Sequence, residues 1–166
     1  KTTKNRLTKN KIPLNNYLPR VEAVDFRSIN EVADRITILC IFFAIQENLE
    51  LVKVLRKYII ENNLNDGLSE KEKLILTKKD LSRQEEIDLS WYSECIYTLC
   101  WSIGFINEMN EPLNEGSLKS LYKFLPPDTE INKFRKSINL INKKRIVEEL
   151  EYYYGLHWAI RHPEEW

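Results

Sequence analysis

The chain has 166 residues, of which 43% are hydrophobic and 30% are charged, and its 25 Lys and Arg residues balance its 25 Asp and Glu residues. This composition excludes a disordered chain and a strongly basic nucleic-acid-binding protein, and it is typical of one soluble globular domain. The four glycines stand at positions 67, 104, 116 and 155. They lie too far apart for a Walker loop, a GxGxxG turn or a GxSxG nucleophile elbow, so enzymes built on those motifs are excluded.

The first 20 residues carry six Lys and Arg residues and no acid, so the rest of the chain has a net charge of −6. We expect a basic helix or arm over residues 1–12 and a proline-containing connector over 13–27. The basic segment lacks interleaved aromatic residues, and the domain behind it is acidic, so we do not expect nucleic acid as a partner. A helix that docks on the acidic body fits better.

Three Ser-x-x-Glu capping boxes predict helix starts. In each box the serine hydroxyl and the glutamate carboxylate satisfy backbone N–H groups that the first helical turn leaves without partners. The three boxes are Ser28 to Glu31, Ser69 to Glu72 and Ser82 to Glu85.

The hydrophobic pattern predicts an all-α single globular domain of about six to eight helices. Two of these helices, about 28–48 and 82–104, are apolar on nearly every side and should be central to the core, and Gly104 should cap the second in a left-handed conformation. Further helices are expected over 49–62, 69–77, 117–124, 130–140 and 143–162.

The cysteines and histidines give no sign of a disulfide framework or a metal site. Cys40, Cys95 and Cys100 lack CxxC spacing and lie in apolar runs, which indicates free thiols in a reducing compartment. His157 and His162 are five residues apart, which turns them about 140° away from each other on a helix. We therefore expect no metal and no cofactor. The segment KTTKNRLTKNKIP has no signal-peptide core, and no apolar run spans a bilayer, so a cytoplasmic protein without membrane contact is predicted.

The helix expected over 82–104 carries a stripe of polar and aromatic side chains. Trp91, Glu94, Thr98 and Trp101 are three or four residues apart and share one helix face. A carboxylate is thereby placed between two indoles. Burying an ionised glutamate is costly unless it is paired, so Glu94 should either meet a cation or carry a raised pKa.

Two arginines are candidate partners for Glu94. Arg35 lies in the first turns of the helix expected over 28–48 and is the leading candidate, and Arg161 is the second. In this interpretation Glu94 is structural and ties two helices together.

The last helix places His157 among aromatic side chains, in a stripe with Tyr154, Trp158 and Arg161. A structural histidine bonded to a carboxylate or carbonyl is one interpretation. The functional alternative is that Glu94 and His157 approach each other as an acid–base pair. Catalysis, if present, would therefore use Glu94 and His157.

Three segments together resemble an uncharacterised, mainly bacterial family, the domain of unknown function 4272 family. The first is the proline-containing connector with the helix entry that follows it, the second has the pattern SW..E....L.W..G, and the third is the C-terminal motif. Their matching residues are Ile12-Pro13, Leu18-Pro19, Arg27-Ser28, Glu31, Arg35, Ser90-Trp91, Glu94, Leu99-Cys100-Trp101, Gly104, Tyr154, His157-Trp158-Ala159 and Arg161.

The resemblance implies an all-helical single domain and makes Arg35, Trp91, Glu94 and Trp158 the positions to test. It implies no activity. The chain departs from the C-terminal motif at two positions, where Glu151 and Gly155 replace an aspartate and an arginine. A role for that arginine cannot be transferred, and a glycine in mid-helix permits a close helix approach.

Without a phosphate, metal or nucleophile motif, the sequence favours a non-enzymatic interaction or scaffold domain with a buried cluster of Trp, Glu, Arg and His side chains. Its partner would be an unidentified protein or a second copy of the chain. The alternative is an enzyme or small-molecule-binding protein with a tryptophan-lined cleft. That cleft would be formed by Trp91, Glu94, Trp101, His157 and Trp158.

Overall fold

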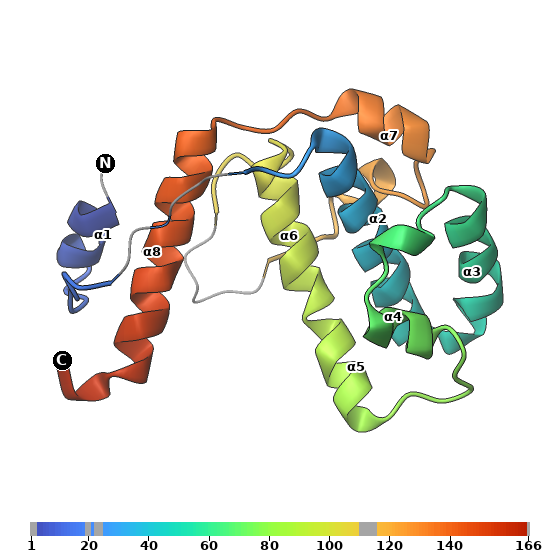
Figure 1. The fold of residues 1–166 in the computed structure, drawn as a ribbon, viewed down its shortest axis with the longest axis horizontal. Helices are drawn as coiled ribbons and strands as arrows, with labels where there is room; N and C mark the ends of the chain where they lie inside the picture. The colour runs from blue at the N-terminus through green and yellow to red at the C-terminus, as the bar shows by residue number, and fades with distance from the viewer. Residues whose placement is uncertain (1–2, 19–20, 22–24, 110–115, 166) are drawn as a thin grey trace. The chain divides into compact units, whose positions relative to one another are not determined.

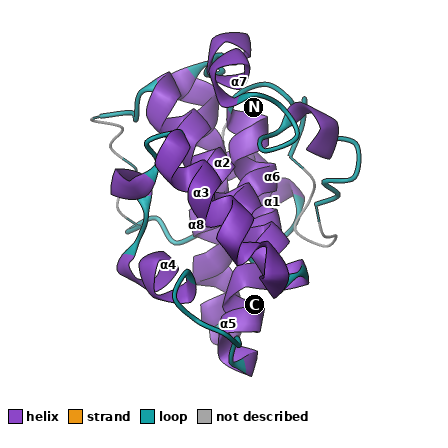
Figure 2. Ribbon diagram, turned by 90° about the vertical axis from the view of Figure 1, so that its right-hand side faces the viewer, coloured by secondary structure: helices purple, strands orange, loops and turns teal. Residues whose placement is uncertain are grey.

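The computed structural model describes residues 3–18, 21, 25–109 and 116–165, and the regular structure in these ranges is helical, with no strand (Figure 2). The expected all-α fold is therefore confirmed. None of the helices in the described ranges has the length and apolar character needed to cross a bilayer. The chain divides into two compact units, a terminal unit of residues 1–26 and 141–166 and a central unit of residues 27–140.

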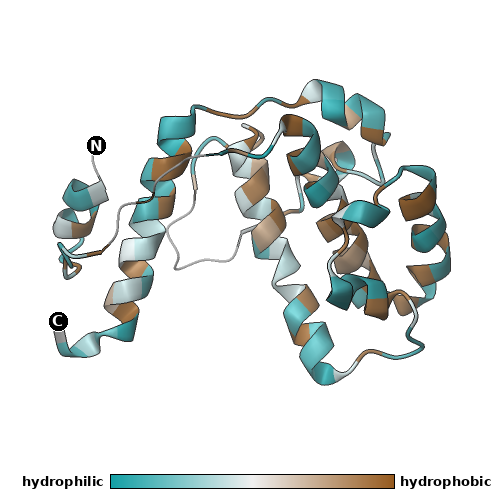
Figure 3. Ribbon diagram, in the orientation of Figure 1, coloured by the Kyte–Doolittle hydropathy of each residue, from teal (hydrophilic) through white to brown (hydrophobic). Residues whose placement is uncertain are grey.

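Helix α2 (Ile29–Glu47) forms the middle of the central unit, where it contacts α3, α5, α6 and α7 (Figure 1). The expected capping box starts it, because the Ser28 hydroxyl accepts the Glu31 N–H at 3.2 Å and the Ser28 N–H donates to the Glu31 carboxylate at 2.8 Å. All side chains over residues 36–42 are buried, in the apolar stretch visible in Figure 3. The first predicted apolar helix is confirmed.

The second predicted apolar helix is interrupted, so the expectation of one continuous helix over 82–104 is wrong. The structure has α5 (Arg83–Ser90) and α6 (Tyr92–Ser102), with a break at Trp91. Two serines at the break donate from their hydroxyls to the carbonyl three residues earlier, Ser90 at 2.8 Å and Ser93 at 2.8 Å. Such bonds compete with the helical ladder and bend it, which the hydrophobic pattern does not reveal.

Gly104 ends α6 as expected, with φ of 79°. The N–H of Phe105 donates to the Cys100 carbonyl at 2.9 Å, and the N–H of Gly104 donates to the Trp101 carbonyl at 3.0 Å. This pair of bonds is the Schellman motif, in which a left-handed residue satisfies the last helical carbonyls. The C-terminal cap read from the sequence is confirmed.

Replacing Gly104 by alanine is expected to lower the free energy of unfolding by about 1 kcal/mol, because a Cβ disfavours positive φ. Urea denaturation followed by circular dichroism measures the change. Gly104→Asn is the matched control, since asparagine tolerates this conformation and should cost less. Equal losses in the two variants would contradict the role given to the left-handed conformation.

The other helices of the central unit are shorter than the sequence suggests. The expected helix over 49–62 is a 3-10 turn followed by α3, and the expected helix over 117–124 is reduced to one 3-10 turn. The capping boxes at Ser69 and Ser82 are both present, as predicted. The elements are η1 (Leu49–Leu51), α3 (Val52–Glu61), η2 (Asn65–Gly67), α4 (Glu70–Ile75), η3 (Tyr122–Phe124) and α7 (Ile131–Ser137).

The terminal unit packs α1 (Thr3–Lys9) against α8 (Lys143–Arg161) (Figure 1). Arg6 forms an ion pair with Glu149, and its guanidinium lies 3.6 Å from the centre of the Tyr152 ring. One positive charge of the basic segment is thus matched by an acid of α8. The short turn η4 (Pro163–Glu165) follows α8.

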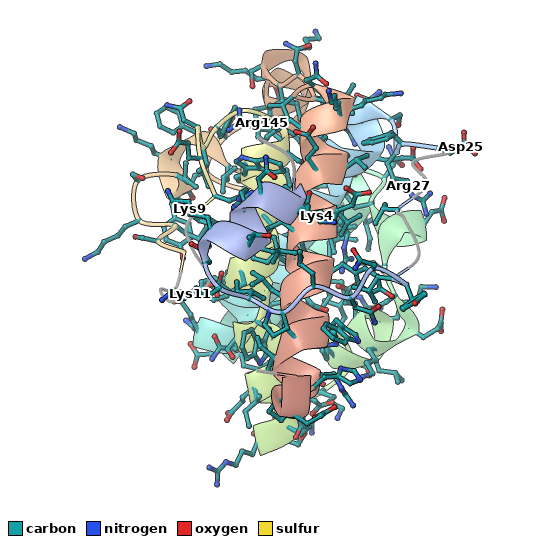
Figure 4. All side chains as sticks on the ribbon, turned by 90° about the vertical axis from the view of Figure 1, so that its left-hand side faces the viewer. Lys4, Lys9, Lys11, Asp25, Arg27 and Arg145 are labelled. Atoms are coloured by element: carbon teal, nitrogen blue, oxygen red, sulfur yellow. The ribbon has the colours of Figure 1, made fainter. Side chains whose placement is uncertain are left out.

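Gly155 allows the two helices of the terminal unit to approach closely. A Cβ at this position would stand 2.8 Å from Cδ1 of Leu7, which is shorter than real Cβ contacts. Leu7 is 5% exposed, so the bare helix surface at Gly155 receives a buried side chain of α1. Three lysines of the basic segment, Lys4, Lys9 and Lys11, are exposed on α1 and the turn after it (Figure 4).

Candidate functional site

Glu72, in the first turn of α4, is the centre of a polar cluster inside the central unit. Its side chain has an exposed fraction of 0%. Oε2 accepts the Ser69 N–H at 2.7 Å and Nη1 of Arg35 at 3.0 Å, while Oε1 contacts Nη2 of Arg35 at 3.0 Å and accepts the Tyr92 hydroxyl at 2.9 Å. Four donor groups from three residues occupy the lone pairs of this carboxylate, which is fully satisfied. We call Arg35, Ser69, Glu72 and Tyr92 the Glu72 cluster.

Arg35 reaches this carboxylate from α2 with both terminal nitrogens, in the two-pronged geometry typical of strong arginine–carboxylate pairs. Its guanidinium carbon also lies 5.9 Å from the centre of the Tyr92 ring, within the range of a cation–π interaction. The Arg35 side chain is 38% exposed, so the pair is buried on one side only. The cluster thereby joins α2, α4 and α6.

The environment fixes the protonation states of the cluster. Burial raises the pKa of Glu72, but hydrogen bonds from Arg35 and the Ser69 N–H outweigh burial, and the pKa lies below its ordinary value of 4.5. Burial and the adjacent carboxylate raise the pKa of Tyr92 to about 12. At neutral pH Glu72 is therefore ionised and Tyr92 protonated. Neither group is poised to exchange a proton with a substrate.

The expected ion pair between Arg35 and Glu94 is not formed, because Arg35 pairs with Glu72 instead. Glu94 is half-buried on α6, and its Oε1 accepts the N–H of Gly116 at 2.9 Å. A Cβ on Gly116 would come within 2.4 Å of the Tyr97 ring, so the backbone there packs closely against that ring. The carboxylate is satisfied by a backbone amide, a partner that residue patterns do not reveal.

The two indoles of the predicted stripe have opposite environments. Trp91 is 65% exposed, whereas Trp101 is 3% exposed. Trp91 lies at the break between α5 and α6, as the N-cap of α6. Because its side chain is exposed, the interpretation of Trp91 as part of a buried polar–aromatic cluster is wrong.

The candidates on α8 lie in the terminal unit. His157 and Arg161 are exposed, and Tyr154 is 39% exposed. Trp158 is half-buried and stacks on His162, with ring centres 4.7 Å apart and planes 19° from parallel. Nδ1 of His162 also lies 2.9 Å from the Trp158 carbonyl oxygen. The exposed His157 does not fit a buried cluster.

The hypothesis of an acid–base pair joins residues of different units, since Glu94 belongs to the central unit and His157 to the terminal unit. The same holds for Arg161 as a partner of Glu94. The structure describes each unit by itself, so the pairing of Glu94 with His157 stays a prediction.

The three cysteines are free thiols, of which Cys95 is exposed. No group of three or more His, Cys, Asp or Glu residues in the described part of the chain is arranged to hold a metal ion. Cys40 and Cys100 are buried free thiols. Burial raises the pKa of both thiols, that of Cys100 to about 12, so they are not nucleophilic thiolates at neutral pH.

A family model described as a domain of unknown function (DUF4272) matches residues 1–164. The chain belongs to this family. The resemblance seen in the sequence is thereby confirmed over nearly the whole length of this DUF4272 chain. Neither a curated protein nor a solved structure matches it. The description of the family assigns no activity to its members.

Glu72 is the residue of this DUF4272 chain that sequence reasoning missed. Its place in the Ser69 capping box identified it as a helix-start residue, and that role is correct. The same carboxylate also receives Arg35, 37 residues away along the chain. The sequence shows Glu72 only as the glutamate of a capping box, with no Lys or Arg three or four residues away on the same helix. This signal is too weak to identify Arg35 as its partner.

Proposed function

We propose that this DUF4272 chain is a non-enzymatic interaction domain of the cytoplasm that binds a partner protein, or a second copy of itself, through α5. The observation that carries the proposal is the exposure of Trp91 at the end of α5, at 65%. A tryptophan buries about 150–250 Å² when covered, and tryptophan is among the residues most enriched at energetic centres of interfaces. A large apolar ring left in water costs stability that binding would recover.

A second apolar side chain of α5 supports the same surface. Ile87, one helical turn before Trp91, is 43% exposed. We call Ile87 and Trp91 the α5 surface.

The Glu72 cluster supports the non-enzymatic part of the proposal. A general acid or base needs a free lone pair or proton near the substrate, and a pKa near the working pH. Glu72 has all its lone pairs occupied, and its pKa is lowered, so it is suited to holding helices together. This arrangement is a structural ion pair rather than a catalytic one.

Replacing Trp91 by serine is expected to weaken association at least tenfold while leaving the fold intact, since the side chain is exposed. Size-exclusion chromatography with light scattering, over a range of concentrations, measures self-association. Binding of a partner is measured with the immobilised chain and an extract of the source cells, followed by titration of the purified partner.

Tyr17→Ser is the matched control, because Tyr17 is an aromatic side chain 95% exposed in the terminal unit. It should leave association unchanged. A wild-type chain that stays monomeric at high concentration and retains no partner would refute the proposal. So would equal weakening by the two substitutions.

A further inference from the structure

The central unit contains a pocket of about 570 Å³ beside the Glu72 cluster. One face of α2 forms one wall, the segment after α3 through η2 forms the opposite wall, and α6 contributes one side chain. The volume lies in the range of about 300–1,000 Å³ typical of small-molecule sites. Its lining comprises Arg27, Glu31, Val32, Asp34, Arg35, Ile38, Asn63, Leu64, Asp66, Gly67 and Leu99.

Local sequence determines how the second wall is built. Asn63 has φ of 56°, and the Leu64 N–H donates to the Ile59 carbonyl at 3.0 Å, so α3 ends in a left-handed cap that turns the chain back towards α2. Gly67 then passes close to α2, where a Cβ would lie 2.8 Å from Cδ1 of Ile38. The wall is held by backbone geometry and does not depend on a ligand.

The floor of the pocket is aliphatic. Ile38 and Leu64 are each 1% exposed, so the apolar surface open to a ligand comes mainly from Val32 and Leu99, which are half-buried. Branched aliphatic side chains of this kind favour an aliphatic group of a ligand over a charged or strongly polar one.

The lining holds two arginines, Arg27 and Arg35, and Arg35 is the more buried of the two. A guanidinium has five N–H donors. On Arg35, Glu72 occupies one on each terminal nitrogen, and Tyr92 also hydrogen-bonds to the group. The Arg35 side chain is 38% exposed and lines the pocket. Arg35 therefore retains N–H donors for an acceptor such as a ligand carboxylate, and the Glu72 cluster holds its guanidinium in place.

The negative groups lie on the same lining. Asp34 is bonded through Oδ1 to Arg135, at 2.8 Å from Nε and 2.7 Å from Nη2. Glu31 pairs with Arg27 at 3.0 Å. Asp66 is exposed and has no ion pair within the described residues. Because the other charges are matched, Asp66 leaves the lining with one uncompensated negative charge.

We propose that this pocket binds a small zwitterion with an aliphatic side chain, which is an α-amino acid or a short peptide. The ligand carboxylate accepts from the free donors of Arg35, the ligand ammonium compensates Asp66, and the side chain lies on the aliphatic floor. Both charged ends are required, since an anion alone would meet the surplus carboxylate and a cation alone would leave the Arg35 donors unused. This site is independent of association through the α5 surface.

Isothermal titration calorimetry with four probes tests the inference. Leucine and leucylleucine are expected to bind saturably at one site. N-acetylleucine, which lacks the ammonium, and leucinamide, which lacks the carboxylate, are expected to bind at least tenfold more weakly. If leucylleucine binds and leucine does not, the site is assigned to peptides. If leucine binds and leucylleucine does not, it is assigned to free amino acids. Failure of both zwitterions to bind would overturn the inference, as would equal binding of all four probes.

A variant pair ties the binding to this pocket. Asp66→Asn removes the unpaired charge at an exposed position and is expected to weaken leucine or leucylleucine binding about tenfold, as loss of a charge-assisted contact does. Asp80→Asn makes the same change at an exposed residue outside the pocket lining and should leave binding unchanged. Circular dichroism confirms that both variants are folded. Unchanged binding by Asp66→Asn would place the ligand elsewhere and refute the assignment.

Discussion

Replacing Glu72 by alanine is expected to lower the free energy of unfolding by about 3–5 kcal/mol, the cost typical of breaking a buried charged pair. The carboxylate is fully buried and binds Arg35, the Ser69 N–H and the Tyr92 hydroxyl. Its removal leaves a guanidinium, an amide and a hydroxyl without their acceptor. Urea denaturation with circular dichroism measures the loss.

Glu70→Ala is the matched control two residues earlier on the same helix. Glu70 is 85% exposed and pairs with Lys73 at 2.7 Å, so its removal should cost less than about 1 kcal/mol, as surface ion pairs do. A loss of similar size in the two variants would show that the Glu72 cluster contributes no more than a surface pair.

The contribution of Glu72 should also depend on pH. Because its pKa is lowered in the folded chain, the unfolded chain binds protons more tightly, and the stabilisation is present above the unfolded value near 4.5. It is lost as the pH falls through the lower pKa of the folded chain. The difference in stability between wild type and Glu72→Gln should therefore shrink on acidification below pH 4.5. If this difference in stability instead grows on acidification, the pKa of Glu72 is raised in the folded chain and not lowered.

Replacing Tyr152 by alanine is expected to release α1 from α8, with a loss of about 3 kcal/mol in the opening free energy of the terminal unit. Tyr152 is 1% exposed, carries the Arg6 guanidinium on its ring, and accepts from Asn10 at its hydroxyl at 3.2 Å. Amide hydrogen exchange of α1 and tryptic cleavage after Arg6 measure the opening.

Two further variants separate the contributions of Tyr152. Tyr152→Phe keeps the ring and loses the hydroxyl, so about 1 kcal/mol should be lost. Tyr154→Ala, on the same helix at a 39% exposed position, should leave exchange in α1 nearly unchanged. Unaltered protection of α1 in Tyr152→Ala would contradict the assigned role of this side chain.

Part of the candidate site was accessible from the sequence. Arg35 was identified as a helix cation facing a carboxylate and as the leading partner of Glu94, and Glu94 as a carboxylate that should meet a cation. Arg35 instead pairs with Glu72, and Glu94 accepts a backbone N–H. The predicted pairing of these two residues with each other was wrong. A backbone N–H such as that of Gly116 carries no residue signature, and Glu72 had already been assigned to its capping box.

The sequence by itself determined the features that depend on a few consecutive residues. The capping boxes at Ser28, Ser69 and Ser82 and the left-handed end at Gly104 are present as predicted, because each involves backbone and side-chain groups within about one helical turn. The all-α fold follows from the same local signals together with the helical spacing of the apolar residues.

The tertiary structure decided which helices end early and which charges meet. At the break near Trp91 the hydroxyls of Ser90 and Ser93 donate to backbone carbonyls. A helical hydrophobic pattern is compatible with these bonds and with serine side chains that point into solvent, so it does not predict the break. The pairing of Arg35 with Glu72 depends on the packing of α2, α4 and α6, and the pocket beside it depends on α2, α6 and the segment 63–67. The free-energy cost of burying an unpaired charge depends on all the groups that surround it. The partner of a buried charged residue therefore depends on the packing of the whole core.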